Sequence, residues 1–81
     1  MMERKHIGKA FGLVLRELRK QSGLTQEQLG FESKTDRVYI SLLERGQRSP
    51  SLLVIFNLAT ALGTTATELV SLVEQRLPGR R

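Results

Sequence analysis

Residues 26–45 constrain the fold of this 81-residue chain more than any other stretch, because they carry the start and stop signals of two short helices. Thr25 and Gln28 have the spacing of a capping box, which predicts that a helix begins directly after Thr25. The apolar pattern then breaks, and Asp36 follows as a favourable N-cap for a second helix. Gly46 ends that second helix. The stretch therefore predicts two helices joined by a tight turn.

The second of these helices has two different faces. Ile40 and Leu43 are three residues apart, so they lie on one side of the helix and face inward. The outward face carries Arg37, Val38, Ser41 and Leu42. Two helices joined by such a turn form a helix-turn-helix, whose second helix enters the major groove of DNA with its N-terminal residues leading. The motif therefore indicates double-stranded DNA as the partner.

Three further helices are predicted around this motif. Apolar residues at three- and four-residue spacing predict helices over residues 7–21, 52–62 and 66–77. Ser51 and Thr65 are the expected N-caps of the last two. The predicted inward face of the helix over 52–62 consists of Leu52, Ile55, Ala59 and Leu62. No strand pattern is present, so the sequence predicts an all-α fold, a compact five-helix domain.

The two ends of the chain are expected to lie outside this domain. Residues 1–6 are polar and mostly charged, which predicts a flexible N-terminal segment. Residues 78–81 form a basic C-terminal tail. The helix-turn-helix DNA-binding domain is accordingly expected to span residues 7–77.

Composition excludes several classes of protein. Thirteen basic residues against eight acidic ones give a net charge of +5, which beside a helix-turn-helix favours a polyanionic partner. There is no cysteine for a disulfide or a thiolate metal site. No apolar run approaches the roughly 20 residues of a membrane span, so we expect a cytoplasmic protein that does not contact a membrane.

Catalytic chemistry has little support in the sequence. His6 is the only histidine, the acidic residues are scattered, and no glycine-rich phosphate loop is present. We therefore expect no enzyme activity, no metal, no cofactor and no small-molecule substrate.

An ordered set of short motifs resembles the Cro/repressor-type, or Xre, family, whose members have lambda-repressor-like DNA-binding domains. The set comprises Phe11-Gly12, Leu15-Arg16-Glu17-Leu18-Arg19, Gly23-Leu24-Thr25-Gln26, Tyr39-Ile40-Ser41, Glu44-Arg45-Gly46, Ser49-Pro50-Ser51-Leu52 and Leu58-Ala59-x-Ala61-Leu62-Gly63. Within the family, Asp36-Arg37-x-Tyr39-Ile40-Ser41 is most similar to the controller proteins of restriction-modification systems. The resemblance implies a sequence-specific transcriptional regulator.

Four outward residues are the candidates for reading bases. Arg37, in the first turn, can donate two hydrogen bonds to the O6 and N7 atoms of guanine. Val38 can contact a thymine methyl group, and Ser41 lies on the same face. Leu42 occupies a site where family members often carry a polar or basic residue. The alternatives are a solvated or phosphate-binding Arg37 and a merely exposed Val38.

A second set of residues is expected to hold the DNA backbone. By resemblance, Gln26 binds a phosphate at the start of its helix, and the alternative is an ordinary polar residue of the first turn. The resemblance to controller proteins favours a DNA contact for the hydroxyl group of Tyr39. The remaining candidates are Lys34, Arg45, Gln47 and Arg48. Such contacts position the protein and set its salt dependence.

The resemblance also implies two structural features. Arg19 and Glu44 occupy the positions of a largely buried ion pair that joins the first helix to the reading helix, so neither is expected to contact DNA. Lys34 stands where the family usually has glycine in the turn. A lysine there must adopt a left-handed backbone conformation or widen the turn. Thr35 replaces an aliphatic residue that is usually buried.

The last two predicted helices carry more apolar residues than one inward face needs. We therefore expect a symmetric homodimer with the interface residues Phe56, Val70, Leu72 and Val73. The alternative is that the helix over 66–77 only completes the core. A two-fold dimer presents two reading helices, so its expected site on DNA is an inverted repeat.

One alternative function belongs to a different class. The motif can instead be a scaffold for protein interaction, as in an antitoxin-like or adaptor module. Val38 and Leu42 on the reading face favour this alternative. The basic residues of segment 45–48 oppose it, because a protein-binding face does not need phosphate contacts.

Overall fold

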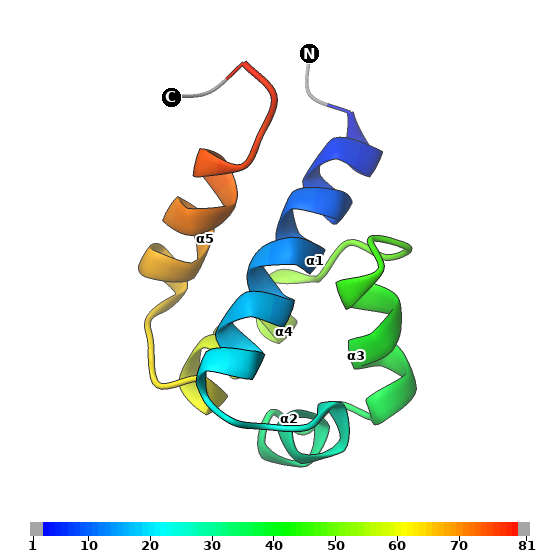
Figure 1. Cartoon of the computed structure of the whole chain (residues 1–81), viewed down its shortest axis with the longest axis vertical. Helices are drawn as coiled ribbons and strands as arrows, with labels where there is room; N and C mark the ends of the chain where they lie inside the picture. Colours follow the sequence, from blue (N-terminus) through cyan, green and yellow to red (C-terminus); the bar gives the residue numbers. More distant parts are fainter. Residues whose placement is uncertain (1–2, 80–81) are drawn as a thin grey trace.

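The computed structural model describes residues 3–79, and this part of the chain folds into five helices without a strand. They are α1 (Arg4–Gln21), α2 (Gln26–Glu32), α3 (Arg37–Glu44), α4 (Leu52–Ala61) and α5 (Ala66–Gln75). The helix α1 lies between α5 and α3, and α2 crosses below it at the end of the molecule away from both termini (Figure 1). The prediction of an all-α, five-helix fold is confirmed.

Side-chain caps locate the N-termini of α2, α3, α4 and α5, as the sequence predicts. The Thr25 hydroxyl accepts a hydrogen bond from the backbone N–H of Gln28 at 3.0 Å, and the Gln28 side chain accepts one from the Thr25 N–H at 2.9 Å. This reciprocal pair completes the capping box of α2. Asp36 caps α3, Ser51 caps α4 and Thr65 caps α5.

Three helix boundaries differ from the prediction, and the smallest difference is in α4, which ends at Ala61, one residue early. The helix α1 begins at Arg4 rather than at residue 7, so the described part of the expected flexible segment is largely helical. The apolar period is absent there because these first residues lie beyond the core, although arginine and lysine are good helix formers. The helix α5 ends at Gln75, two residues early. Residues 1–2 and 80–81 of the expected segments lie outside the described residues.

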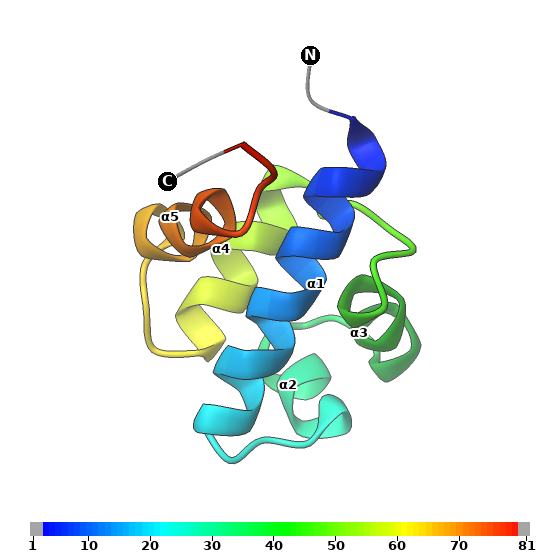
Figure 2. The same cartoon turned by 45° about the horizontal axis from the view of Figure 1, so that its top comes forward.

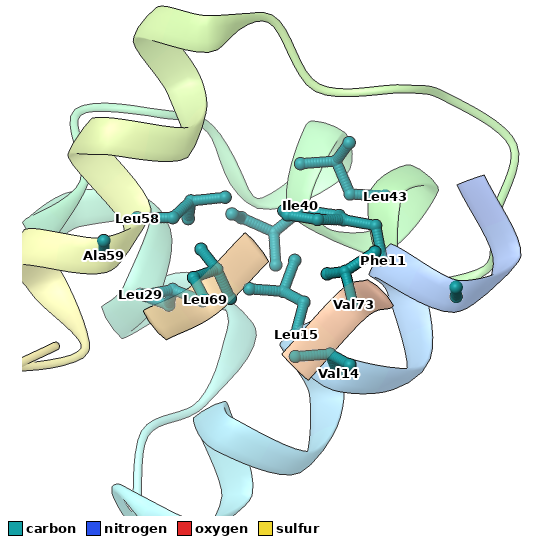
Figure 3. Close-up of a cluster of buried hydrophobic side chains, with 11 residues drawn as sticks. Phe11, Val14, Leu15, Leu29, Ile40, Leu43, Leu58, Ala59, Leu69 and Val73 are labelled. Carbon is teal, nitrogen blue, oxygen red and sulfur yellow. The ribbon is translucent and has the colours of Figure 1, made fainter. Parts of the chain in front are cut away.

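The core is a single apolar cluster to which all five helices contribute (Figure 3). Phe11 and Leu15 from α1 lie at its centre, and Ile40 and Leu43 from α3 face them, as predicted. The other helices contribute Leu29, Leu58, Ala59, Leu69 and Val73. Leucines, valines and one isoleucine fill most of the space, so packing rather than polar contacts excludes water from this region.

The inward face of α4 was predicted only in part. Ala59 is buried and Ile55 and Leu62 are half-buried, but Leu58 supplies the fully buried side chain and Leu52 is 69% exposed. The sequence of α4 is apolar on nearly every side, so its spacing does not distinguish the core face from the opposite one. Which side faces the core depends on where α5 and α2 pack.

Val73 was expected in a dimer interface, and the structure corrects this. Its side chain is 7% exposed because α5 turns both Leu69 and Val73, one helical turn apart, toward the core. Leu72 is half-buried against the same cluster. Val70, which was also expected in the interface, is 41% exposed on the outer side of α5.

No single helix within residues 3–79 is long and apolar enough to cross a membrane. The helices α4 and α5 reach the necessary length only as a pair, and the chain bends by 103° between them. Both helices contribute side chains to the protein core.

The turn between α2 and α3 contains the predicted left-handed residue. Lys34 has a φ of 58°, a conformation that costs a residue with a Cβ atom roughly 1–2 kcal/mol. The turn is closed by a hydrogen bond of 2.7 Å from the Thr35 N–H to the Gly30 carbonyl oxygen. The Ser33 hydroxyl is buried and donates to the carbonyl oxygen of Leu29 at 2.7 Å.

Replacing Lys34 with glycine is expected to stabilise the domain by about 1 kcal/mol, because glycine adopts a positive φ without steric cost. Chemical denaturation monitored by circular dichroism measures this change. Lys34→Ala is the matched control, since it removes the same charge but keeps the Cβ atom, and it is expected to leave stability nearly unchanged. Equal stabilities for the glycine and alanine variants would contradict the backbone explanation.

Candidate nucleic-acid interface

The helix α3 presents its predicted outward residues to different extents. Arg37 and Val38, at its first two positions, are exposed, and Val38 is 57% accessible. Ser41 and Leu42 follow one turn later and are half-buried. Side chains at the start of α3 are therefore the most accessible to an external partner.

The start of α3 is held by its cap. The Asp36 side chain accepts a hydrogen bond of 2.8 Å from the backbone N–H of Tyr39, which satisfies one of the free donors of the first turn. Tyr39 itself is half-buried and packs against the apolar core. Its ring therefore helps to hold α3 in place, and a contact between its hydroxyl group and DNA stays a prediction.

The far end of α3 docks closely on α1. Gly12 is buried, and a Cβ atom at this position would lie 2.5 Å from the carbonyl oxygen of Leu43 and 2.6 Å from that of Glu44. These separations are too short for any side chain, so the approach of the two helices depends on glycine at this site. The orientation of α3 on the rest of the domain follows from this contact.

A charged network holds the same junction and confirms the predicted ion pair. The Nε atom of Arg19 lies 2.5 Å from Oε2 of Glu44, and Nη2 donates to Oε1 at 3.1 Å. The exposed fractions of the two side chains are 12% and 3%. Arg19 also donates to the carbonyl oxygen of Leu24 at 2.9 Å. Both charges are therefore buried as a hydrogen-bonded, two-point pair.

The hydrogen bond to Glu44 raises the pKa of Arg19 above the ordinary value for arginine, against the opposing effect of burial. A pKa that is raised on folding adds stability that is complete below the unfolded-state pKa and is lost as pH rises through the folded-state pKa. Arginine titrates only in strongly alkaline solution, so this contribution from Arg19 persists through neutral and moderately alkaline pH.

Gln26 has a partner that the sequence did not reveal. Its Nε2 atom donates to Oε1 of Glu44 at 3.0 Å, so Gln26 belongs to the network that joins α1 and α3. The interaction spans eighteen positions in the sequence, and no local pattern signals it. The amide nitrogen has a second N–H group, which leaves one donor for a phosphate.

The other residues that are predicted to contact the DNA backbone, apart from Tyr39, lie at the two ends of α3. Lys34 is exposed in the turn before the helix, and Arg45, Gln47 and Arg48 are exposed in the segment after it. The guanidinium group of Arg48 donates to the carbonyl oxygen of Gln47 at 2.9 Å. With Arg37, the cationic side chains bracket the exposed start and the exit of α3.

Large apolar side chains are exposed in three further places that the predicted DNA-binding residues do not include, and one of these is α1, where Leu13 is 52% exposed. Phe31, near the end of α2, is 86% exposed. Leu52 and Phe56 of α4 line one hollow together with Val70 of α5, and Leu53 is exposed on the same helix α4. The periodicity of α4 does not distinguish these outer residues from inner ones, so Leu52 was assigned to the wrong side. Phe31 has no signal in the sequence that separates it from a core residue.

Metal chemistry has no support in the described part of the chain. Between residues 3 and 79, no three histidine, cysteine, aspartate or glutamate side chains come close enough to hold a metal ion.

Comparison with known proteins identifies the class. The helix-turn-helix family (HTH_3) matches residues 15–69. The HTH-type transcriptional regulator y4dJ of Sinorhizobium fredii is 38% identical over 78 residues, which cover 96% of each chain. The control protein C.BamHI of Bacillus amyloliquefaciens is 41% identical over 61 residues, covering 74% of this chain and 75% of that protein.

A solved structure is similar to this chain in both fold and sequence. The restriction-modification controller protein C.AhdI of Aeromonas hydrophila superimposes with a TM-score of 0.74 and 52% identity, covering 76% of this chain and 94% of that one. The chain belongs to the helix-turn-helix family, in its Xre-type branch. It is a DNA-binding transcriptional regulator and not an enzyme.

Replacing Arg19 with alanine is expected to destabilise the domain by roughly 3–5 kcal/mol, because Glu44 would remain buried without its partner. Thermal and urea unfolding measure the loss. Arg76→Ala provides the control, since Arg76 pairs with Glu17 through side chains that are 42% and 49% exposed. An exposed pair contributes at most about 1 kcal/mol. Similar losses for both variants would show that burial does not distinguish the two pairs.

Proposed function

We propose that α3 enters the major groove of double-stranded DNA and reads the sequence there. The observation that carries this proposal is the division of α3 into a buried face and an exposed start that carries Arg37 and Val38. Cationic side chains at both ends of the helix complement the phosphates on the two sides of a groove. A protein-interaction module would not need these cations, so this arrangement favours DNA.

Each exposed group has a role in the proposed complex. Arg37 reads guanine through two hydrogen bonds, and Val38 contacts the methyl group of thymine. Ser41 and Leu42 lie one turn later and also contact bases. They are half-buried, so a smaller part of each side chain is available for this contact. Gln26, Lys34, Tyr39, Arg45, Gln47 and Arg48 hold the phosphate backbone. The ion pair of Arg19 and Glu44 supports these contacts without touching DNA.

The active species in this proposal is a homodimer formed through α4 and α5. Phe56 is 55% exposed and Val70 is 41% exposed, and both line a hollow of about 380 Å³ between the two helices. Leu52 and Leu53, each 69% exposed, extend the apolar surface along α4. Apolar side chains gathered in this way favour burial against a second copy. Leu72 is half-buried and Val73 belongs to the core, so they contribute little to such an interface.

A dimer of this kind predicts the form of the operator. Two copies related by a two-fold axis present two α3 helices, so the bound site is an inverted repeat with half-sites about one helical turn apart. The similarity to C.AhdI and C.BamHI supports a role like that of a control protein, acting on DNA in the cytoplasm.

The dimer is tested by a charge placed on its proposed surface. Phe56→Glu is expected to convert a micromolar sample from dimer to monomer in sedimentation equilibrium, because a buried carboxylate at an interface lacks a partner. Leu13→Glu is the matched control, since Leu13 is 52% exposed on α1 and lies outside the proposed interface. A wild-type protein that sediments only as monomer would contradict the dimer, as would an equal effect of both variants.

Base reading is tested by comparing two arginines. Arg37→Ala is expected to cost about 1–3 kcal/mol per half-site and to relax the preference for guanine at one position. Arg48→Ala is expected to weaken binding to all sequences equally, as the loss of a phosphate contact does. Fluorescence anisotropy on a duplex chosen by binding selection, and on a copy changed at the guanine, separates the two. If Arg37→Ala loses the same affinity on both duplexes, Arg37 contacts the backbone instead.

A further inference from the structure

One hollow on the surface lies outside the predicted DNA-binding residues of α3. It has a volume of about 480 Å³ and is lined by residues 3–5 at the start of α1 and residues 46–49 after α3. Three cationic side chains, Arg4, Lys5 and Arg48, line it together with one carboxylate, Glu3. The hollow therefore has an excess of positive charge in a protein that already carries +5.

The first turns of α1 are held against this loop by a close backbone contact. Gly8 is buried, and a Cβ atom there would lie 3.2 Å from the carbonyl oxygen of Gly46. The same contact is close when it is measured from the loop, because a Cβ atom on Gly46 would lie 3.2 Å from Cα of Lys9. The loop after α3 passes beside the first half of α1 in both views (Figures 1 and 2). The contact accounts for a glycine inside a helix, which otherwise lowers helix stability.

The glycines of α1 form one line that ends at the hollow. Gly12 contacts the end of α3, and Gly8, one turn earlier, contacts the following loop. Arg4 lies one further turn along the same line, because residues four apart share a helix face. The start of α1 is therefore placed beside Arg48, which already belongs to the proposed set of phosphate contacts.

We infer that the start of α1 and the loop after α3 form a second binding site for the DNA backbone, with Arg4, Lys5 and Arg48 as its phosphate ligands. The site takes a phosphodiester group of the same duplex that α3 reads, so this inference rests on the proposed function. The hollow adjoins the exit of α3, and Glu3 is the one carboxylate among the residues that line it, beside three cationic residues. It lengthens the backbone contact beyond the helix-turn-helix motif itself.

The salt dependence of binding measures this site. Each phosphate neutralised on duplex DNA contributes about 0.9 to the slope of log affinity against log salt concentration. The double variant Arg4→Ala/Lys5→Ala is expected to lower the magnitude of that slope by about 1.8. Between 50 and 200 mM salt, the wild-type affinity would then fall about tenfold more than that of the variant. Arg48→Ala alone is expected to lower the slope by about 0.9.

Arg76→Ala is the control for loss of positive charge, because Arg76 is the C-cap of α5. The helix α5 lies on the side of α1 away from α3 (Figure 1). Its slope should match that of the wild type, and circular dichroism should show that all variants are folded. Glu3→Gln is expected to tighten DNA binding, since it removes the carboxylate from the hollow. Hydroxyl-radical footprints of Arg4→Ala/Lys5→Ala and Arg48→Ala should lose protection at the same sugars, with protection elsewhere retained.

The outcomes separate this inference from the proposed function. If the wild type shows no salt-dependent binding to duplex DNA, the proposed function fails. If the wild type and Arg48→Ala behave as expected but Arg4→Ala/Lys5→Ala matches Arg76→Ala, only the site at the start of α1 is overturned. Titration with inorganic phosphate distinguishes a free anion from DNA. Binding of phosphate at Lys5 and Arg48, seen by NMR, with an unchanged footprint in the variant would also overturn the inference.

Discussion

The buried ion pair between Arg19 and Glu44 is the interaction on which the arrangement of α1, α2 and α3 depends. It joins α1 to the last residue of α3, and its remaining hydrogen bonds reach Leu24 and Gln26. Removing two charges from water is costly unless they are paired in good geometry. A shifted α3 would leave Glu44 buried without its partner, so neighbouring arrangements of the helices are strongly disfavoured. The first residue of α2 is tied to the same carboxylate, which makes the three helices one unit.

This support is separate from the surface that we propose to contact DNA. Ile40 and Leu43 are fully buried, and the ion pair lies on the inner side of the domain. Arg37 and Val38 take part in neither the buried core nor the ion-pair network. The side chains that fix the position of α3 in the fold are therefore different from those that we propose to read the bases. Buried and exposed residues lie on opposite faces of α3, because they recur with the helical period. Eight residues can therefore both pack against the core and present an exposed surface.

Local chemistry made most of the fold predictable, and long-range packing made the rest unpredictable. The caps at Thr25, Asp36, Ser51 and Thr65 each involve groups three residues apart, and all four are present. The face of α4 and the burial of Val73 depend on how α5 docks, which an apolar sequence does not specify. The bond from Gln26 to Glu44 and the contact of Gly8 with Gly46 join distant segments, so only the folded chain reveals them.

The contact at Gly12 has a consequence for how such a regulator can diverge. The absent side chain at this position lets α3 lie against α1, and a single added methyl group would collide with two carbonyl oxygens. Any larger residue must push away the end of α3 and tilt its start, which would alter all of the proposed base contacts together. The exposed positions of α3 carry no such restriction. Recognition of a new operator can therefore arise by exchanging a few surface side chains, while the contact of α3 with Gly12 tolerates almost no variation.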